Sequence, residues 1–111
     1  MKPMRLHHVG IVIPDMKKAQ AFLAQFSLDT DYMEYVDAYH AHCLFTKYGD
    51  RESPIELVIP TDGILKEYRN GKGGLHHIAF EVEDVEKTRQ EFADKGLEML
   101  EDAAVPGAGG I

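Results

Sequence analysis

A motif that begins with two adjacent histidines occurs twice in this chain. The first copy, His7-His8-Val-Gly-Ile-Val-Ile-Pro-Asp15, has a near match in His76-His77-Ile-Ala-Phe-Glu-Val-Glu-Asp84. Each copy is a run of alternating apolar residues followed by a segment with helical spacing. An internal repeat of this kind indicates that the chain is built from two related halves, and every other motif has to fit that duplicated plan.

The length of the chain limits how the two halves can fold. With 111 residues in total, two separate units would each be too small to bury an adequate core. We therefore expect both halves to share one core. The alternation and capping signals predict strands over 6–13, 32–39, 41–48, 55–59, 75–82 and 97–101, and helices over 16–26 and 85–95.

These elements predict an α+β fold made of two tandem βαβββ modules, with a curved mixed sheet and the helices outside it. The first module is expected over 1–62, a glycine-rich linker over 63–74, and a second, truncated module over 75–111. The second half contains only two predicted strands where the first contains four. An unpaired sheet edge would result, and we expect either a homodimer that covers it or a longer native chain that supplies the missing strands.

Composition excludes several classes of function. A net charge of −7 without a basic patch argues against nucleic acid as a partner. No apolar run approaches the ~20 residues of a membrane span, and the N-terminus lacks a signal-peptide pattern. The single cysteine, Cys43, fits a reducing compartment and is interpreted as an inert core thiol. We therefore expect a cytoplasmic protein that does not interact with membranes.

Alternation assigns a face of the sheet to each residue of three strands. One face is apolar and is expected to pack against the helices; it comprises Val9, Ile11, Ile13, Ile55, Leu57, Ile59, Ile78, Phe80 and Val82. The opposite face then holds His8, Glu56 and His77 beside the small residues Gly10 and Ala79.

Small residues next to polar ones leave room for a ligand. A single strand histidine is more often a surface or core residue, but two histidines and a glutamate on one face are typical of a metal site. Imidazole nitrogen and carboxylate oxygen suit Zn, Ni, Co, Fe or Mn. The pattern therefore predicts a divalent metal ion held by His8, Glu56 and His77. His7 and His76 fall on the apolar face and are interpreted as hydrogen-bonded structural residues.

The duplicated unit resembles the vicinal oxygen chelate superfamily, which includes glyoxalases, bleomycin resistance proteins and dioxygenases. Three segments are most similar to methylmalonyl-CoA epimerase, with glyoxalase I second: Ile-Glu-Leu-Val-Ile-Pro (55–60), Gly-Gly-Leu-His-His-Ile-Ala (73–79) and Val-Pro-Gly-Ala-Gly-Gly (105–110). The resemblance implies four metal ligands, three of which are matched by His8, Glu56 and His77. The fourth, a glutamate on the last strand of the second module, has no counterpart before Ile111.

The same resemblance implies an activity. It implies a metal-dependent epimerase of a 2-methyl-branched acyl-CoA thioester, such as methylmalonyl-CoA, in which the metal holds an enolate. Glu56 is then a ligand and a candidate proton-transferring carboxylate, and His42 is a candidate base if it faces the cavity. Two alternatives stay open: a glyoxalase I-like lactoylglutathione lyase, and a metal-free protein that binds a small molecule such as an antibiotic.

Overall fold

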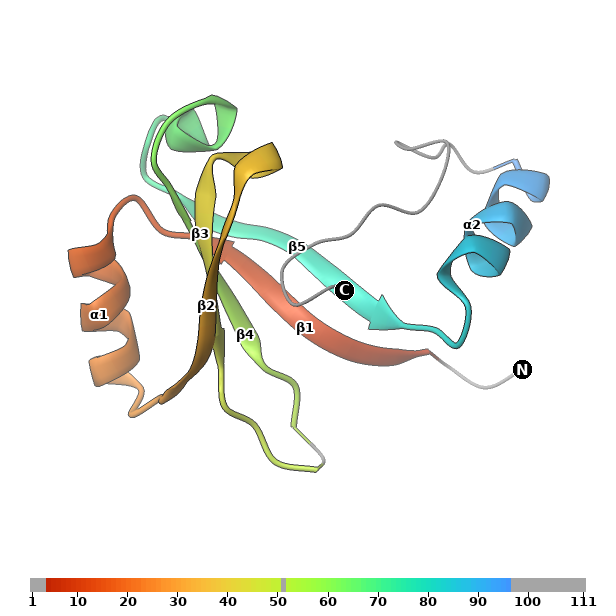
Figure 1. Cartoon of the computed structure of the whole chain (residues 1–111), viewed down its shortest axis with the longest axis horizontal. Coiled ribbons are helices and arrows are strands. Elements are labelled where there is room, and N and C mark those ends of the chain that lie inside the picture. The colour runs from red at the N-terminus through yellow and green to blue at the C-terminus, as the bar shows by residue number, and fades with distance from the viewer. Residues whose placement is uncertain (1–3, 51, 97–111) are drawn as a thin grey trace.

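A computed structural model of the chain describes residues 4–50 and 52–96 and has the predicted α+β architecture (Figure 1). Its elements in chain order are β1 (Arg5–Val12), α1 (Met16–Gln25), β2 (Thr30–Val36), β3 (Ala41–Thr46), β4 (Ile55–Pro60), β5 (Gly74–Glu81) and α2 (Val85–Asp94), with short 3₁₀ helices at Asp37–Tyr39 and Ile64–Glu67. The strand predicted over 97–101 lies outside the described residues. In the described ranges, no helix is long and apolar enough to cross a membrane.

The strands form one mixed, twisted sheet in the order β2-β3-β4-β1-β5 (Figure 1). Strand β1 runs parallel to β4 and antiparallel to β5. The first strand of each sequence repeat is therefore paired with the other. In this register His8 lies opposite Ala79, and Gly10 lies opposite His77. The two histidine motifs thus lie side by side on neighbouring strands of one sheet.

The apolar face of the first half packs against α1, as predicted. Its buried cluster contains Ile13, Ala19, Leu44, Leu57 and Ile59. Helix α1 begins where predicted because the Asp15 carboxylate accepts a hydrogen bond from the Lys18 backbone N–H, which caps the first turn. This face holds the central strands in place and leaves their other face free to form a site.

The expectation that a helix also covers the apolar face of β5 is wrong for the described residues. Ile78 and Phe80 are 55% and 51% exposed, and α2 contributes no buried side chain. Asp84 caps α2, and Gly96 adopts a positive φ of 88° just after its last turn, so the helix lies within one residue of its predicted range. However, the turn after β5 directs α2 away from the sheet (Figure 1), so the helix does not cover this strand.

The hairpin formed by β2 and β3 begins and ends two residues earlier than predicted. Strand β2 ends at Val36, and Asp37–Tyr39 forms a 3₁₀ turn before β3. His40 closes this turn in the left-handed conformation with a φ of 51°. The turn brings Tyr39 and His40 to one end of the open face of the sheet.

Candidate metal centre

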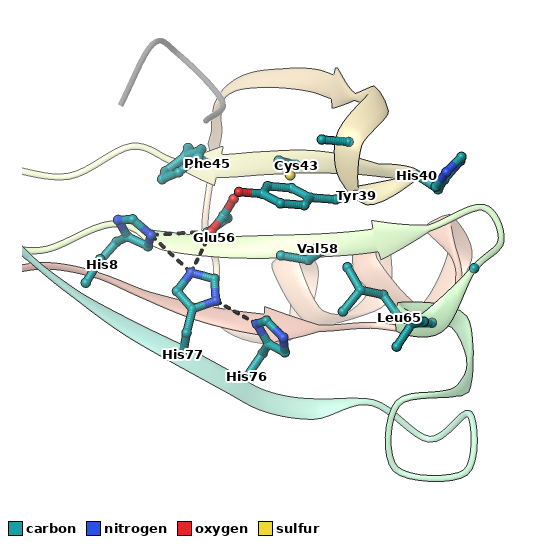
Figure 2. A pocket seen from close by; sticks show the side chains of 14 residues that line it. His8, Tyr39, His40, Cys43, Phe45, Glu56, Val58, Leu65, His76 and His77 are labelled. Carbon is teal, nitrogen blue, oxygen red and sulfur yellow. Dashed lines mark hydrogen bonds and ion pairs between the residues drawn. The ribbon is translucent and has the colours of Figure 1, made fainter. Parts of the chain in front are cut away.

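Three adjacent strands bring the predicted ligands together on the open face of the sheet. His8 comes from β1, Glu56 from β4 and His77 from β5. Gly10 on β1 lies in register with Glu56 on one side and with His77 on the other. Period-two alternation then places all three side chains on the same face, and Figure 2 shows them pointing toward one another.

The distances between the three groups fit a bound cation. His8 Nε2 and His77 Nε2 lie 3.3 Å apart, and they lie 3.3 Å and 3.0 Å from Glu56 Oε1. Two ligand atoms at about 2.1 Å from one ion, at octahedral or tetrahedral angles, are separated by about 3.0–3.4 Å. The donor set of two imidazoles and one carboxylate also suits a divalent transition metal. His8, Glu56 and His77 thus have the spacing and chemistry of a metal centre.

The electrostatics of Glu56 favour a cation at this position. The Glu56 side chain is buried, which by itself would raise its pKa. Hydrogen bonds from His77 and His8, together with their Coulombic attraction, outweigh that burial and lower the pKa to about 2. The carboxylate is therefore ionised at neutral pH and provides a buried negative charge between the two imidazoles.

A glycine provides the space for one of the ligands. A Cβ atom placed on Gly10 would lie 2.1 Å from His77 Cε1 and 2.4 Å from His77 Nε2. The His77 ring therefore occupies the volume that a side chain at position 10 would fill. This agrees with the interpretation that small residues on this face leave room for a site.

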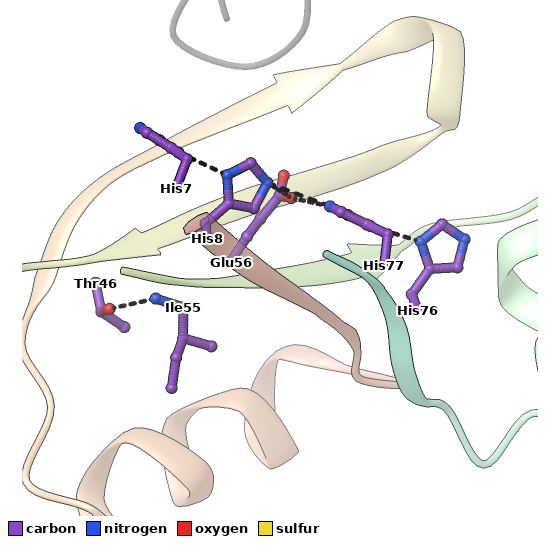
Figure 3. A network of polar contacts seen from close by, with 7 residues as sticks. All are labelled: His7, His8, Thr46, Ile55, Glu56, His76 and His77. Carbon is purple, nitrogen blue, oxygen red and sulfur yellow. Dashed lines mark hydrogen bonds and ion pairs between the residues drawn. The ribbon is translucent and has the colours of Figure 1, made fainter. Parts of the chain in front are cut away.

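The neighbouring histidines are closer to the site than alternation predicts. Nδ1 of His7 lies 2.8 Å from Nδ1 of His8, and Nδ1 of His76 lies 2.8 Å from Nδ1 of His77 (Figure 3). His76 also lines the cavity beside the ligands, so its placement on the apolar face was wrong. Desolvation, followed by the charge of the adjacent histidine, lowers the pKa of both His7 and His76.

The reason for this difference is the register of β1 and β5. Leu6 pairs with Phe80 and His8 with Ala79, which leaves His7 as an extra residue; His76 is likewise extra between the pairs Gly10/His77 and Ile11/Leu75. Each extra residue produces a β-bulge, and a bulge rotates a side chain out of simple alternation. One feature of the sequence could have indicated that His7 and His76 lie near the site: both copies of the motif begin with two adjacent histidines.

The ligand cluster forms the polar end of a cavity of about 770 Å³. Figure 2 shows that this cavity continues along β3 and β4 toward the 3₁₀ turn after β4. Its walls beyond the cluster are mostly apolar: Ala38, Tyr39, Cys43, Phe45, Val58, Ile64 and Leu65. A volume of this size falls in the range of about 300–1,000 Å³ that is usual for small-molecule sites.

The structure does not bring His42 to the site. Alternation along β3 turns Cys43 and Phe45 into the cavity, so His42 points to the opposite face, where its ring contacts Tyr35 at a centroid distance of 5.0 Å. Among the described residues that line the cavity, His42 is absent. Its predicted role as a base that faces the cavity therefore has no geometric support.

We expect the Cys43 thiol to be unreactive in the folded protein. The residue is 1% exposed, and burial and the nearby Glu56 carboxylate raise its pKa to about 12. The nucleophilic thiolate is therefore scarce at pH 8. Titration with a disulfide reagent at pH 8 should detect no fast-reacting thiol in native protein and one thiol after unfolding in guanidinium. Rapid modification of the native protein would contradict this placement.

Comparisons with known proteins agree with the fold and the site. Residues 7–111 match the model of the Glyoxalase/Bleomycin resistance protein/Dioxygenase superfamily. The chain is 30% identical over 112 residues to mitochondrial methylmalonyl-CoA epimerase from Bos taurus, and equally to the Homo sapiens protein; each match covers 96% of this chain and 62% of the relative. The chain thus spans less than two thirds of the length of these curated relatives.

Solved structures of similar proteins have the same fold. A hypothetical protein from Bacillus halodurans superposes with a TM-score of 0.85 and 31% identity, over 98% of this chain and 80% of that one. A methylmalonyl-CoA epimerase in complex with methylmalonyl-CoA and NH4+ superposes with a TM-score of 0.84 and 25% identity, over 98% and 81%. On the sequence match and this shared architecture, the chain belongs to the glyoxalase/bleomycin resistance protein/dioxygenase superfamily.

Proposed function

We propose that this protein is a metal-dependent epimerase of a 2-methyl-branched acyl-CoA thioester such as methylmalonyl-CoA. The observation that carries the proposal is the convergence of His8, Glu56 and His77 at the polar end of a mostly apolar cavity. A mostly apolar pocket with a few convergent polar groups is the usual form of a site for a small organic substrate. The similarity to methylmalonyl-CoA epimerases supports the choice of substrate.

The three ligands would hold a divalent cation, which when bound supplies a Lewis acid for a carbonyl oxygen. Two neutral imidazoles and one carboxylate cancel only one of its two positive charges. A divalent ion together with these three ligands would therefore carry a net charge of about +1, which would stabilise negative charge that develops on a substrate oxygen. The described residues would supply three ligand atoms to such an ion, one each from His8, Glu56 and His77.

The ionised Glu56 and the apolar lining of the cavity have separate roles in this proposal. The low pKa of Glu56 fits a permanently ionised ligand better than a group that accepts a proton from carbon. The apolar side chains of Phe45, Val58 and Leu65 line the cavity and lower the local polarity, which would strengthen electrostatic interactions there.

Proton exchange at the substrate carbon tests the proposal. Cobalt-loaded protein incubated with methylmalonyl-CoA in deuterated water should introduce deuterium at C2, as detected by mass spectrometry. The His77→Ala variant should lose this exchange, and the His42→Ala variant should keep it. Absence of exchange by protein that retains its metal would contradict the proposal. Formation of lactoylglutathione from methylglyoxal and glutathione would identify a lyase instead.

A further inference from the structure

We infer that His7 and His76 are positioning residues for the metal centre, each of which accepts a hydrogen bond from Nδ1–H of the adjacent ligand and so keeps the ligand's Nε2 free to bind the cation. The inference rests on the proposed metal site but concerns residues outside the ligand set. It is carried by two equivalent contacts, the 2.8 Å Nδ1 to Nδ1 distances of His7 with His8 and of His76 with His77 (Figure 3).

The contacts depend on the two bulges. In a regular strand, consecutive side chains point to opposite faces, so the rings of adjacent histidines could not meet edge to edge. Here the extra residue of each bulge is a histidine, once on β1 and once on β5. The ring centroids of both pairs lie 5.0 Å apart, with interplanar angles of 83° and 86°. The same arrangement is thus built twice, on opposite strands of one ladder.

Counting protons assigns donor and acceptor. Two imidazole nitrogens 2.8 Å apart must share one proton, because two lone pairs would repel each other and two N–H groups would clash. A nitrogen that binds a cation carries no proton, so a neutral ligand histidine with a metal on Nε2 keeps its proton on Nδ1. With the ion bound in place of the Nε2 contacts to Glu56, His8 and His77 are therefore the donors, and His7 and His76 are the acceptors.

Such contacts affect affinity through the orientation and basicity of the ligand. A hydrogen-bond acceptor behind a ligating histidine fixes its tautomer and ring angle, and its loss typically costs about 10- to 100-fold in metal affinity. The two pairs differ in exposure: the side chain of His8 is 10% exposed and that of His77 is 34% exposed. Water can replace a lost acceptor more easily at His77, so the His7 contact should matter more.

Substitutions that separate hydrogen bonding from packing test the inference. Phenylalanine keeps a ring at the position but removes the acceptor, whereas asparagine removes the ring but can place an amide oxygen near the former Nδ1. Zinc affinity of the metal-free protein would be measured by competition with a chelator. We expect His7→Phe and His76→Phe to weaken Zn²⁺ binding about 10- to 100-fold, with the larger loss for His7, and the asparagine variants to retain most of the affinity.

A role in packing alone predicts the opposite order, with phenylalanine tolerated and asparagine harmful. His42→Phe is the matched control, because His42 is a strand histidine outside the cavity, and it should bind Zn²⁺ as the wild type does. Nitrogen-15 NMR of the Zn²⁺-loaded wild type should show Nδ1 of His8 and His77 protonated. Wild-type affinity in both phenylalanine variants, or a deprotonated Nδ1 in either ligand, would overturn the inference.

The outcomes also distinguish this inference from the proposed function. If the wild-type protein fails to bind Zn²⁺, both the metal centre and the positioning role are refuted. If the phenylalanine variants lose affinity as expected but the loaded wild type exchanges no substrate proton, only the proposed reaction fails. If exchange occurs and all four variants bind Zn²⁺ normally, only the positioning role fails.

Discussion

Replacing His77 by alanine is expected to abolish retention of a divalent ion after dialysis while leaving the protein folded. The substitution removes one of the three groups whose ligand atoms lie within 4.8 Å of one another. The two remaining groups provide too few ligands to hold the ion against dilution. Because the His77 side chain is 34% exposed and borders the cavity, its removal leaves the buried α1 cluster intact. Elemental analysis measures the metal, and circular dichroism measures the fold.

The His42→Ala variant is the control for this experiment. It removes a histidine from the same sheet, but from the face opposite the cavity, where the His42 ring contacts Tyr35. It should retain as much metal as the wild type. Equal metal content in the His77→Ala protein would refute the ligand assignment.

Replacing Gly10 by alanine is expected to disable the site almost as completely, although Gly10 contributes no ligand atom. The added methyl group would lie 2.1 Å from Cε1 of His77, a distance at which the ring has to move. On the other side, His77 Nε2 already lies 3.0 Å from Glu56 Oε1, so the ring has no room to shift toward the carboxylate. The His77 ring would therefore rotate out of the cluster. Metal content after dialysis should fall to near that of His77→Ala.

Gly49→Ala is the matched control for the Gly10 variant. Its added methyl group would contact mainly the exposed Glu52 side chain, with Oε1 at 2.8 Å, and a flexible carboxylate can move away. Metal content should be unchanged in this variant. If Gly10→Ala protein retained its metal, the close packing of the His77 ring over position 10 would be disproved.

Much of this site can be predicted from sequence because alternation is a strong constraint in paired strands. Once Ile55, Leu57 and Ile59 are assigned to the core, Glu56 has to point the other way. The same rule correctly places His8 and His77 on that face. The helix caps were predictable as well, since Asp15 and Asp84 are local signals that act within four residues.

The errors arise where the structure departs from local rules. The bulges at His7 and His76 are not marked by a glycine or proline in the sequence. The register shifts depend only on how β1 pairs with β5, so the positions of these two histidines were not predicted. The sequence does not determine which face of the sheet His42 occupies, because β3 has buried residues on both faces: Leu44 points toward α1 and Cys43 toward the cavity. The exposure of Ile78 depends on where α2 lies, which no short segment of sequence determines.

The register between the two repeats has a consequence for how such a site can originate. In each motif a histidine precedes a small residue by two positions, His8 before Gly10 and His77 before Ala79. Antiparallel pairing sets the histidine of each copy opposite the small residue of the other. One short sequence is thus self-complementary, as in the isologous contact of a twofold dimer. Duplication of a single strand thus provides a histidine ligand and also the small residue that makes room for the histidine of the other copy. A larger residue at the small position of one copy would therefore displace the ligand of the other copy.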